Sequence, residues 1–160
     1  MKFYFALLTV CFISLNTHAQ FTLLPYIGKV KDAEAAGIRQ QIDKKYKSAI
    51  DASDKSKCVF KTSKEQDALM KAYQNFLMEL GNYLSDPNFK WGQPTKCWNR
   101  IYFNKDGSVE YYVFNIKTEI SDEKTEQYKA LFRSFISTHK IAITATEGFA
   151  QCSPVTFIDK

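Results

Sequence analysis

The sequence contains few of the residues from which catalytic and metal sites are usually built. Among its 160 residues there are two histidines and four cysteines, and no two cysteines form a Cys-X-X-Cys pair. It contains neither a glycine-rich phosphate loop nor a Gly-X-Ser-X-Gly motif. Ligands scattered in this way match none of the usual zinc spacings. We therefore expect no metal site and no cofactor.

Long apolar runs are also scarce, and the single one lies at the N-terminus. Residues 1–20 read MKFYFALLTVCFISLNTHAQ, in which an apolar core follows Lys2 and small residues stand at Thr17 and Ala19. This pattern is typical of a secretory signal peptide, and its core is shorter than the roughly 20 residues that span a bilayer. We interpret residues 1–19 as a signal peptide and expect an exported bacterial protein, periplasmic or secreted. An uncleaved membrane anchor is the alternative.

Neither sign of charge dominates the chain. Lysine and arginine number 22 against 17 aspartates and glutamates, a formal net charge of +5. An excess this small and this dispersed does not indicate a nucleic-acid partner. Because no second apolar run reaches membrane length, we expect that the mature form does not span a membrane.

Periodicity divides the rest of the chain into an N-terminal helical segment, 20–62, and an α+β domain, 63–160. The first segment has an apolar lead-in and a charged helix over 31–53. The apolar stripe of this helix is narrow, with one residue every four positions: Ile38, Ile42, Tyr46 and Ile50. A stripe of this kind drifts around the helix, so loose packing is expected.

Two stronger amphipathic helices are predicted in the α+β domain, over 64–83 and 122–139. Ser63 is the expected N-cap of the first, with Gln66 completing a capping box. Ser121 is the expected N-cap of the second, followed by acidic residues that the helix dipole favours. Both helices carry a broad apolar face at helical spacing.

The stretch IYFNKDGSVEYYVF, residues 101–114, predicts the turn of a β-hairpin over 97–116. Asn104 and Gly107 are suited to a three-residue loop that ends in a glycine bulge. If Asn104 pairs with Ser108, counting outward places Phe103 opposite Val109, and the following pairs are Ile101 with Tyr111, Asn99 with Val113, Tyr102 with Glu110, Arg100 with Tyr112 and Trp98 with Phe114.

The last predicted strand, 151–158, contains Pro154, which cannot donate to a ladder and therefore favours a sheet edge. The predicted fold class is thus α+β. A small antiparallel sheet, made of the hairpin and this edge strand, packs on the two amphipathic helices, and the N-terminal helix is additional.

The order helix, strand, strand, helix, strand over residues 63–158 resembles the C-terminal domain of TonB-type energy-transducing proteins. The resemblance is carried by IYFNKDGSVEYYVF, by the helix that follows it and by the closing SPVTF. It implies an envelope protein whose edge strand accepts a partner peptide. The chain has no Pro-rich spacer of the kind found in that family, so energy transduction is not implied.

Strand topology predicts which cysteines pair. A right-handed crossover through the second strong helix places the last strand beside the first hairpin strand. Cys97 and Cys152 then start these strands at opposite ends, about 17 Å apart at 3.3 Å per residue, beyond the roughly 7 Å limit for a disulfide. We therefore predict a Cys58–Cys152 disulfide and a free Cys97.

One hairpin face should lie beneath the two strong helices, with Ile101, Phe103, Val109, Tyr111 and Val113. The opposite face, beside Glu110, would carry the candidate binding residues, Trp98, Arg100, Tyr102, Tyr112 and Phe114. Tyrosine, tryptophan and arginine are enriched at binding hot spots. The alternative is that residues 21–53 lie across this face and make its aromatic residues part of the core.

Two classes of function remain open from the residues. The first is a non-enzymatic protein- or peptide-binding module that uses the aromatic sheet face or the edge at Pro154. The second is a small secreted enzyme with a carboxylate- or Cys97-centred site. Its only histidine outside the signal peptide, His139, is better interpreted as a helix-capping residue than as a general base. Dimerisation through the hairpin is a third alternative.

Overall fold

The computed structural model of the protein describes residues 25–51, 53–85 and 89–159, and the predicted signal peptide lies outside them. The elements follow in this order: β1 (Tyr26–Lys29), α1 (Val30–Ala35), α2 (Ile38–Lys45), β2 (Lys47–Ser48), the 3-10 turn η1 (Lys55–Lys57), α3 (Ser63–Tyr83), β3 (Thr95–Phe103), β4 (Val109–Ile116), α4 (Asp122–Thr138) and β5 (Phe149–Phe157). Within the described ranges, no helix has both the length and the apolar character needed to cross a membrane.

The five strands form one sheet in the order β1-β4-β3-β5-β2. β3 runs antiparallel to both β4 and β5, so the last strand lies beside the first hairpin strand as predicted. The α+β fold class is confirmed, but the sheet is mixed. β1 pairs with β4 and β2 pairs with β5, both in parallel, which adds a short strand from the N-terminal segment to each edge.

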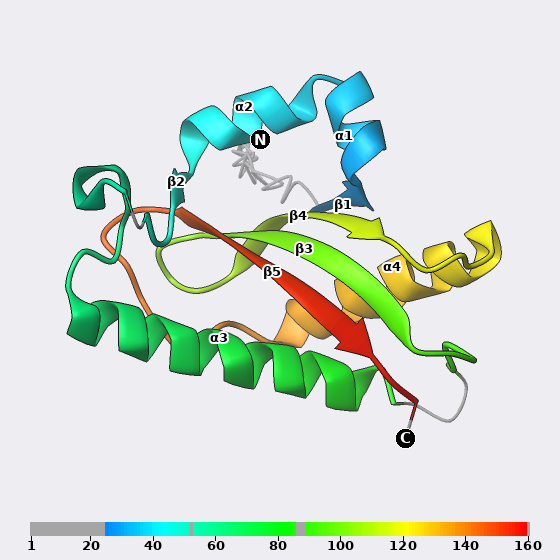
Figure 1. The fold of residues 1–160 in the computed structure, drawn as a ribbon. Coiled ribbons are helices and arrows are strands. Elements are labelled where there is room, and N and C mark those ends of the chain that lie inside the picture. The colour runs from blue at the N-terminus through cyan, green and yellow to red at the C-terminus, as the bar shows by residue number, and fades with distance from the viewer. Residues whose placement is uncertain (1–24, 52, 86–88, 160) are drawn as a thin grey trace, which may run out of the picture.

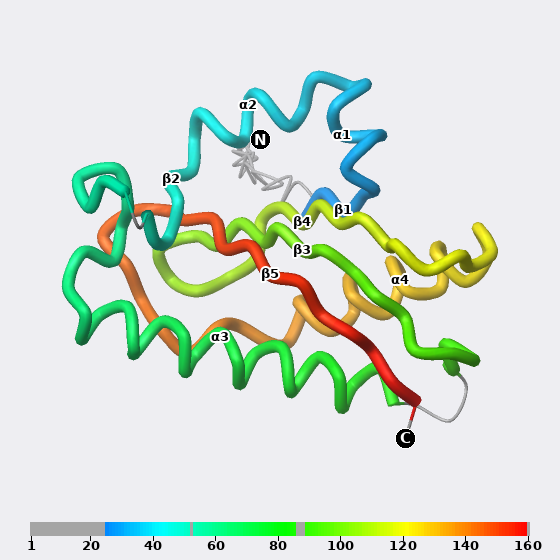
Figure 2. Tube along the Cα trace, in the orientation of Figure 1, coloured from blue at the N-terminus to red at the C-terminus, as the bar shows by residue number. Residues whose placement is uncertain are grey.

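Helices cover both faces of this sheet (Figure 1). The two long helices, α3 and α4, pack on the face that we call the inner face, as predicted. The short helices α1 and α2 lie over the opposite, outer face, and the chain crosses it from β1 at one edge to β2 at the other (Figure 2). Because β1 and β2 are strands of the same sheet, they hold both ends of this crossing segment.

The helix boundaries follow from capping residues. Thr62, one residue before the expected Ser63, is the N-cap of α3. Its hydroxyl accepts from the Glu65 N–H at 3.2 Å, and the Glu65 carboxylate accepts from the Thr62 N–H at 2.8 Å. This reciprocal pair is a capping box. Ser121 caps α4 as predicted and accepts from the Lys124 N–H at 3.2 Å.

The single N-terminal helix predicted over 31–53 is wrong. Gly37 has a φ of 67°, in the left-handed region, and separates α1 from α2. The helix ends at Lys45, and Tyr46 is already extended. A residue without a side chain adopts positive φ at little cost, which allows the chain to turn at Gly37 instead of continuing one long helix.

The hairpin loop forms as expected, but the register beyond it differs. The Asn104 N–H donates to the Ser108 carbonyl at 2.8 Å, and Gly107 has a φ of 83°. Phe103 pairs with Val109, yet Tyr102 pairs with Tyr111. Glu110 is therefore an extra residue in β4, a β-bulge. The predicted pairing of Ile101 with Tyr111 is wrong, because Ile101 pairs with Tyr112.

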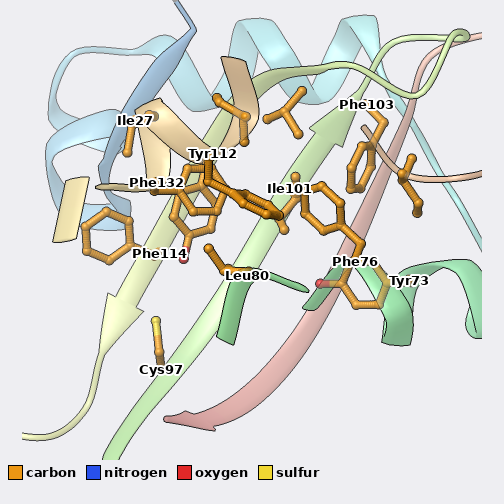
Figure 3. Packing of buried hydrophobic residues seen from close by; sticks show 14 of the residues in the cluster. Ile27, Tyr73, Phe76, Leu80, Cys97, Ile101, Phe103, Tyr112, Phe114 and Phe132 are labelled. Carbon is orange, nitrogen blue, oxygen red and sulfur yellow. The ribbon is translucent and has the colours of Figure 1, made fainter. Parts of the chain in front are cut away.

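The main hydrophobic core fills the space between the inner face and the two long helices (Figure 3). Aromatic rings dominate it. Phe76 of α3 packs edge-on against Phe103 of β3, and Phe132 of α4 stacks on Tyr112 of β4. A second, smaller core lies between the outer face and the α1–α2 segment. Its buried members are Ala33, Ile42, Tyr46, Tyr102, Val113 and Ala150.

The predicted Cys58–Cys152 disulfide is wrong, because the three cysteines of the described ranges are free. Ser48 of β2 pairs with Ala150 of β5 and also bridges to Cys58. β2 thus lies between Cys58 and the strand that carries Cys152. Cys97 is free as predicted and lies on the inner face.

Candidate functional site: the free edge of β5

The five candidate binding residues do not form one surface. Trp98, Arg100 and Tyr102 of β3 lie on the outer face, whereas Tyr112 and Phe114 of β4 belong to the main core. A bulge inserts one residue into a strand, and side chains alternate between faces, so every β4 side chain beyond Glu110 faces the opposite way from the prediction. The prediction of one continuous aromatic surface is therefore wrong.

Tyr112 and Phe114 serve the fold. Both are 0% exposed, and the Tyr112 ring stacks on Phe132 with 3.9 Å between centroids. The Tyr112 hydroxyl donates to Asn99 Oδ1 at 2.5 Å and lies 2.6 Å from the Tyr128 hydroxyl. Desolvation by burial raises the pKa of Tyr112 well above its ordinary value. Its hydroxyl is therefore a neutral hydrogen-bonding group inside the core.

Tyr102 and Arg100 are held beneath α2 by a single carboxylate. The Tyr102 hydroxyl donates to Asp43 Oδ1 at 2.8 Å, and Arg100 Nη2 donates to the same oxygen at 2.9 Å. Arg100 Nη1 also lies 3.0 Å from the Cys152 sulfur. The alternative in which the N-terminal segment covers the aromatic face is thus confirmed for the part of the outer face that carries Arg100 and Tyr102.

Trp98 lies beyond the part of the outer face that α2 covers. Its neighbours across the ladder are Asn115 of β4 and Pro154 of β5, and its side chain is partly exposed. The other aromatic candidate on the outer face of β3 is Tyr102, which is fully buried. A single partly exposed tryptophan does not form a contiguous aromatic platform.

A second contact between α2 and the hairpin was not predicted. Lys45 Nζ lies 2.6 Å from Glu110 Oε1, and the Tyr46 hydroxyl donates to Glu110 Oε2. Tyr46 is only 3% exposed and packs edge-on against Tyr102. Glu110 is the bulged residue of β4, and these partners hold it against the end of α2. The sequence carries no local signal for this contact, because Tyr46 and Lys45 lie 64 and 65 residues before Glu110 in the chain.

The outward edge of β5 is free over most of its length. Among the described residues, β2 pairs only with Phe149 and Ala150 of β5, and the remainder, 151–157, pairs with β3 alone. The Ala49 N–H donates to the Ala150 carbonyl at 2.8 Å, so this carbonyl points away from β3. Backbone groups point the same way at every second residue. The carbonyls of Cys152, Pro154 and Thr156 therefore face the open edge, with the N–H groups of Cys152 and Thr156. The Cys152 carbonyl accepts from Gln151 Nε2 at 3.2 Å.

Pro154 is placed as predicted. It pairs with Trp98 in the ladder and is exposed. The alternation just described directs its nitrogen, which carries no hydrogen, to the open side. The ladder to β3 thus loses no hydrogen bond, while the open edge lacks one donor. Proline at an edge is one way in which proteins limit unspecific strand pairing.

An apolar groove of about 290 Å³ lies between this edge and α3. It is lined from α3 by Leu77, Met78 and Gly81, from β5 by Val155 and Phe157, and from the segment between α3 and β3 by Trp91. The Trp91 ring stacks on Phe157 with 5.1 Å between centroids, and both residues line the groove. A free strand edge beside an apolar groove offers both backbone and side-chain contacts to an extended segment.

Cys97 and His139, two of the residues considered for catalysis, are engaged in the fold. Cys97 is 2% exposed, and desolvation by burial raises the pKa of its thiol to about 12. A protonated, buried thiol is a poor nucleophile. His139 is the C-cap residue of α4, as predicted, and its Nδ1 lies 3.0 Å from the Phe135 carbonyl oxygen. The described ranges contain no group of three or more potential metal ligands.

Comparison with family models, with curated proteins and with solved structures gives no match to this chain.

Proposed function

We propose that the protein is a non-enzymatic binding module that takes up an extended segment of another protein along the free edge of β5. The supporting observation is that the outward edge of β5 over residues 151–157 pairs with no other strand among the described residues. An added strand would hydrogen-bond to the carbonyls and N–H groups that face outward there. The aromatic sheet face has no part in this proposal, because α2 covers half of it.

The expected place of action is the bacterial envelope or the extracellular space. This follows from the sequence pattern of residues 1–19. The resemblance of residues 63–158 to TonB C-terminal domains leads to the same expectation, and it stays a prediction.

Strand addition has a signature that binding at a side-chain patch lacks. In a paired strand, the N–H groups of every second residue point to the neighbour. We would select binders from a phage library of eight random residues on the mature protein, from Gln20 onward, and synthesise the best peptide. Two versions would carry N-methyl groups at alternate residues, one on the odd positions and one on the even positions.

We call the odd and the even peptide positions the two phases. N-methylation of one phase is expected to weaken binding at least tenfold, and N-methylation of the other phase less than threefold. The difference arises because only one phase removes donors that face β5. Equal effects of the two phases, or a library from which no binder emerges, would contradict strand addition.

A further inference from the structure

A glycine of α3 lines the groove beside β5, at a position where most other residues would stabilise the helix more. Gly81 lies in the last turns of α3, its φ is not positive, and a Cβ built on it meets no atom within 4 Å. Neither a turn nor a close approach therefore requires glycine there. Glycine weakens a helix relative to alanine. The structural effect of Gly81 is that it leaves space at the α3 side of the groove.

Large apolar side chains stand exposed at both margins of this space. Met78 of α3 is 61% exposed and Ile158, just after β5, is 67% exposed. Both line the groove. Methionine is frequent at surfaces that adapt to apolar partners, because its side chain is flexible and polarisable. Exposed apolar residues around an apolar groove indicate a place that a partner covers.

The charges around the groove indicate what kind of side chain would enter. Among the described residues, Asp159 is the only charged one that lines it. Its carboxylate accepts from the Trp91 N–H at 2.9 Å and from the Gly92 N–H at 2.8 Å. This carboxylate is therefore already engaged, and no lysine or arginine of the described ranges lines the groove to balance an acidic guest. An uncharged, apolar side chain is the complementary occupant.

Strand geometry connects the groove to the edge. Side chains alternate between the two faces of a sheet. A segment paired with β5 would direct every second side chain to the inner face, where Val155 and Phe157 also point toward α3. One of these side chains would lie over Gly81 and Met78.

We propose that the groove between α3 and β5 is the specificity pocket for a large apolar side chain of the bound segment, and that Gly81 sets its size. This inference rests on the proposed strand addition at β5. The partner is an extended, uncharged stretch of another protein with leucine, isoleucine, methionine or phenylalanine at one fixed position. The pocket adds selectivity for a side chain, whereas backbone pairing at a strand edge does not by itself depend on the sequence of the bound segment.

The test uses the best peptide from the eight-residue library and the mature protein with one of three substitutions. Gly81→Leu fills the groove with a good helix former, so the fold should persist, as thermal unfolding would verify. Gly81→Ala fills it only in part. Asn75→Leu adds the same apolar side chain at an exposed position of α3 outside the groove.

We expect Gly81→Leu to raise the Kd of the peptide at least tenfold, Gly81→Ala to raise it less, and Asn75→Leu to leave it unchanged. Replacing the fixed apolar residue of the peptide by aspartate should also raise the Kd at least tenfold. Equal Kd values for the wild type and Gly81→Leu, together with sensitivity to one phase of N-methylation, would overturn the pocket while strand addition stands. If Gly81→Leu abolishes binding but the two N-methylated peptides bind equally well, strand addition is overturned. The proposal of a side-chain pocket for a segment paired with β5 is then overturned with it.

Discussion

Glu110 binds partners from an element that lies far away in the sequence. Its carboxylate contacts Lys45 and Tyr46, which follow one another at the end of α2. Burial by itself raises the pKa of Glu110, but hydrogen bonds from Lys45 and Tyr46 outweigh this effect and lower the pKa below the ordinary value of 4.5. Hydrogen bonds to a charged group contribute more to stability than neutral ones.

A lowered pKa in the folded state makes this contact dependent on pH. Its contribution is present above the unfolded pKa of about 4.5 and is lost as the pH falls through the lower folded pKa. We expect Glu110→Gln to reduce the free energy of unfolding by about 1 kcal/mol at pH 7. The difference from the wild type should be smaller at pH 3 than at pH 7. Urea unfolding at both values measures it, and a difference that does not depend on pH would contradict the assignment.

At the scale of elements, the bulge determines which hairpin residues support the core. Tyr111 and Tyr112 are neighbours of the same type, but Tyr112 is fully buried beneath α4, and Tyr111 is partly exposed on the outer face. This pair offers a matched test of the observed register.

Tyr112→Ala should lower the free energy of unfolding by about 3–5 kcal/mol, because it removes a large buried ring and leaves a cavity. Tyr111→Ala should lower it by about 1 kcal/mol, since part of that ring is already in water. Urea unfolding of both variants measures the difference. The predicted register without a bulge would reverse this order.

Elements with local signals could be predicted, and elements that depend on distant partners could not. Gly107 and the apolar periodicity of α3 and α4 act within a few residues, so the hairpin loop and both helices were found. β2 has two residues and exists only because Ser48 meets Ala150. Likewise, Pro154 indicates an edge by its own chemistry, but the groove at Gly81 depends on where α3 packs.

At the scale of the whole molecule, two cores of unequal size share one sheet. The inner core joins α3, α4 and the sheet through many buried aromatic residues, whereas the outer core has six buried residues. Ionic contacts such as Asp43 with Arg100, at 2.9 Å, add to the smaller one. Regions with few buried contacts open at lower free energy than the rest of a protein. The α1–α2 segment should therefore open without unfolding of the main core.

Hydrogen exchange of Ile42→Ala tests this independence. Ile42 is 3% exposed in the outer core, and its truncation should cost about 2 kcal/mol, the lower part of the range for such changes. We expect α2 amides to exchange at least tenfold faster, while α3 and α4 amides keep their rates. As a control, Leu80→Ala removes a fully buried side chain of the inner core and should accelerate exchange in all elements. If Ile42→Ala accelerates exchange in α3 and α4 as much as in α2, the two layers unfold as one unit.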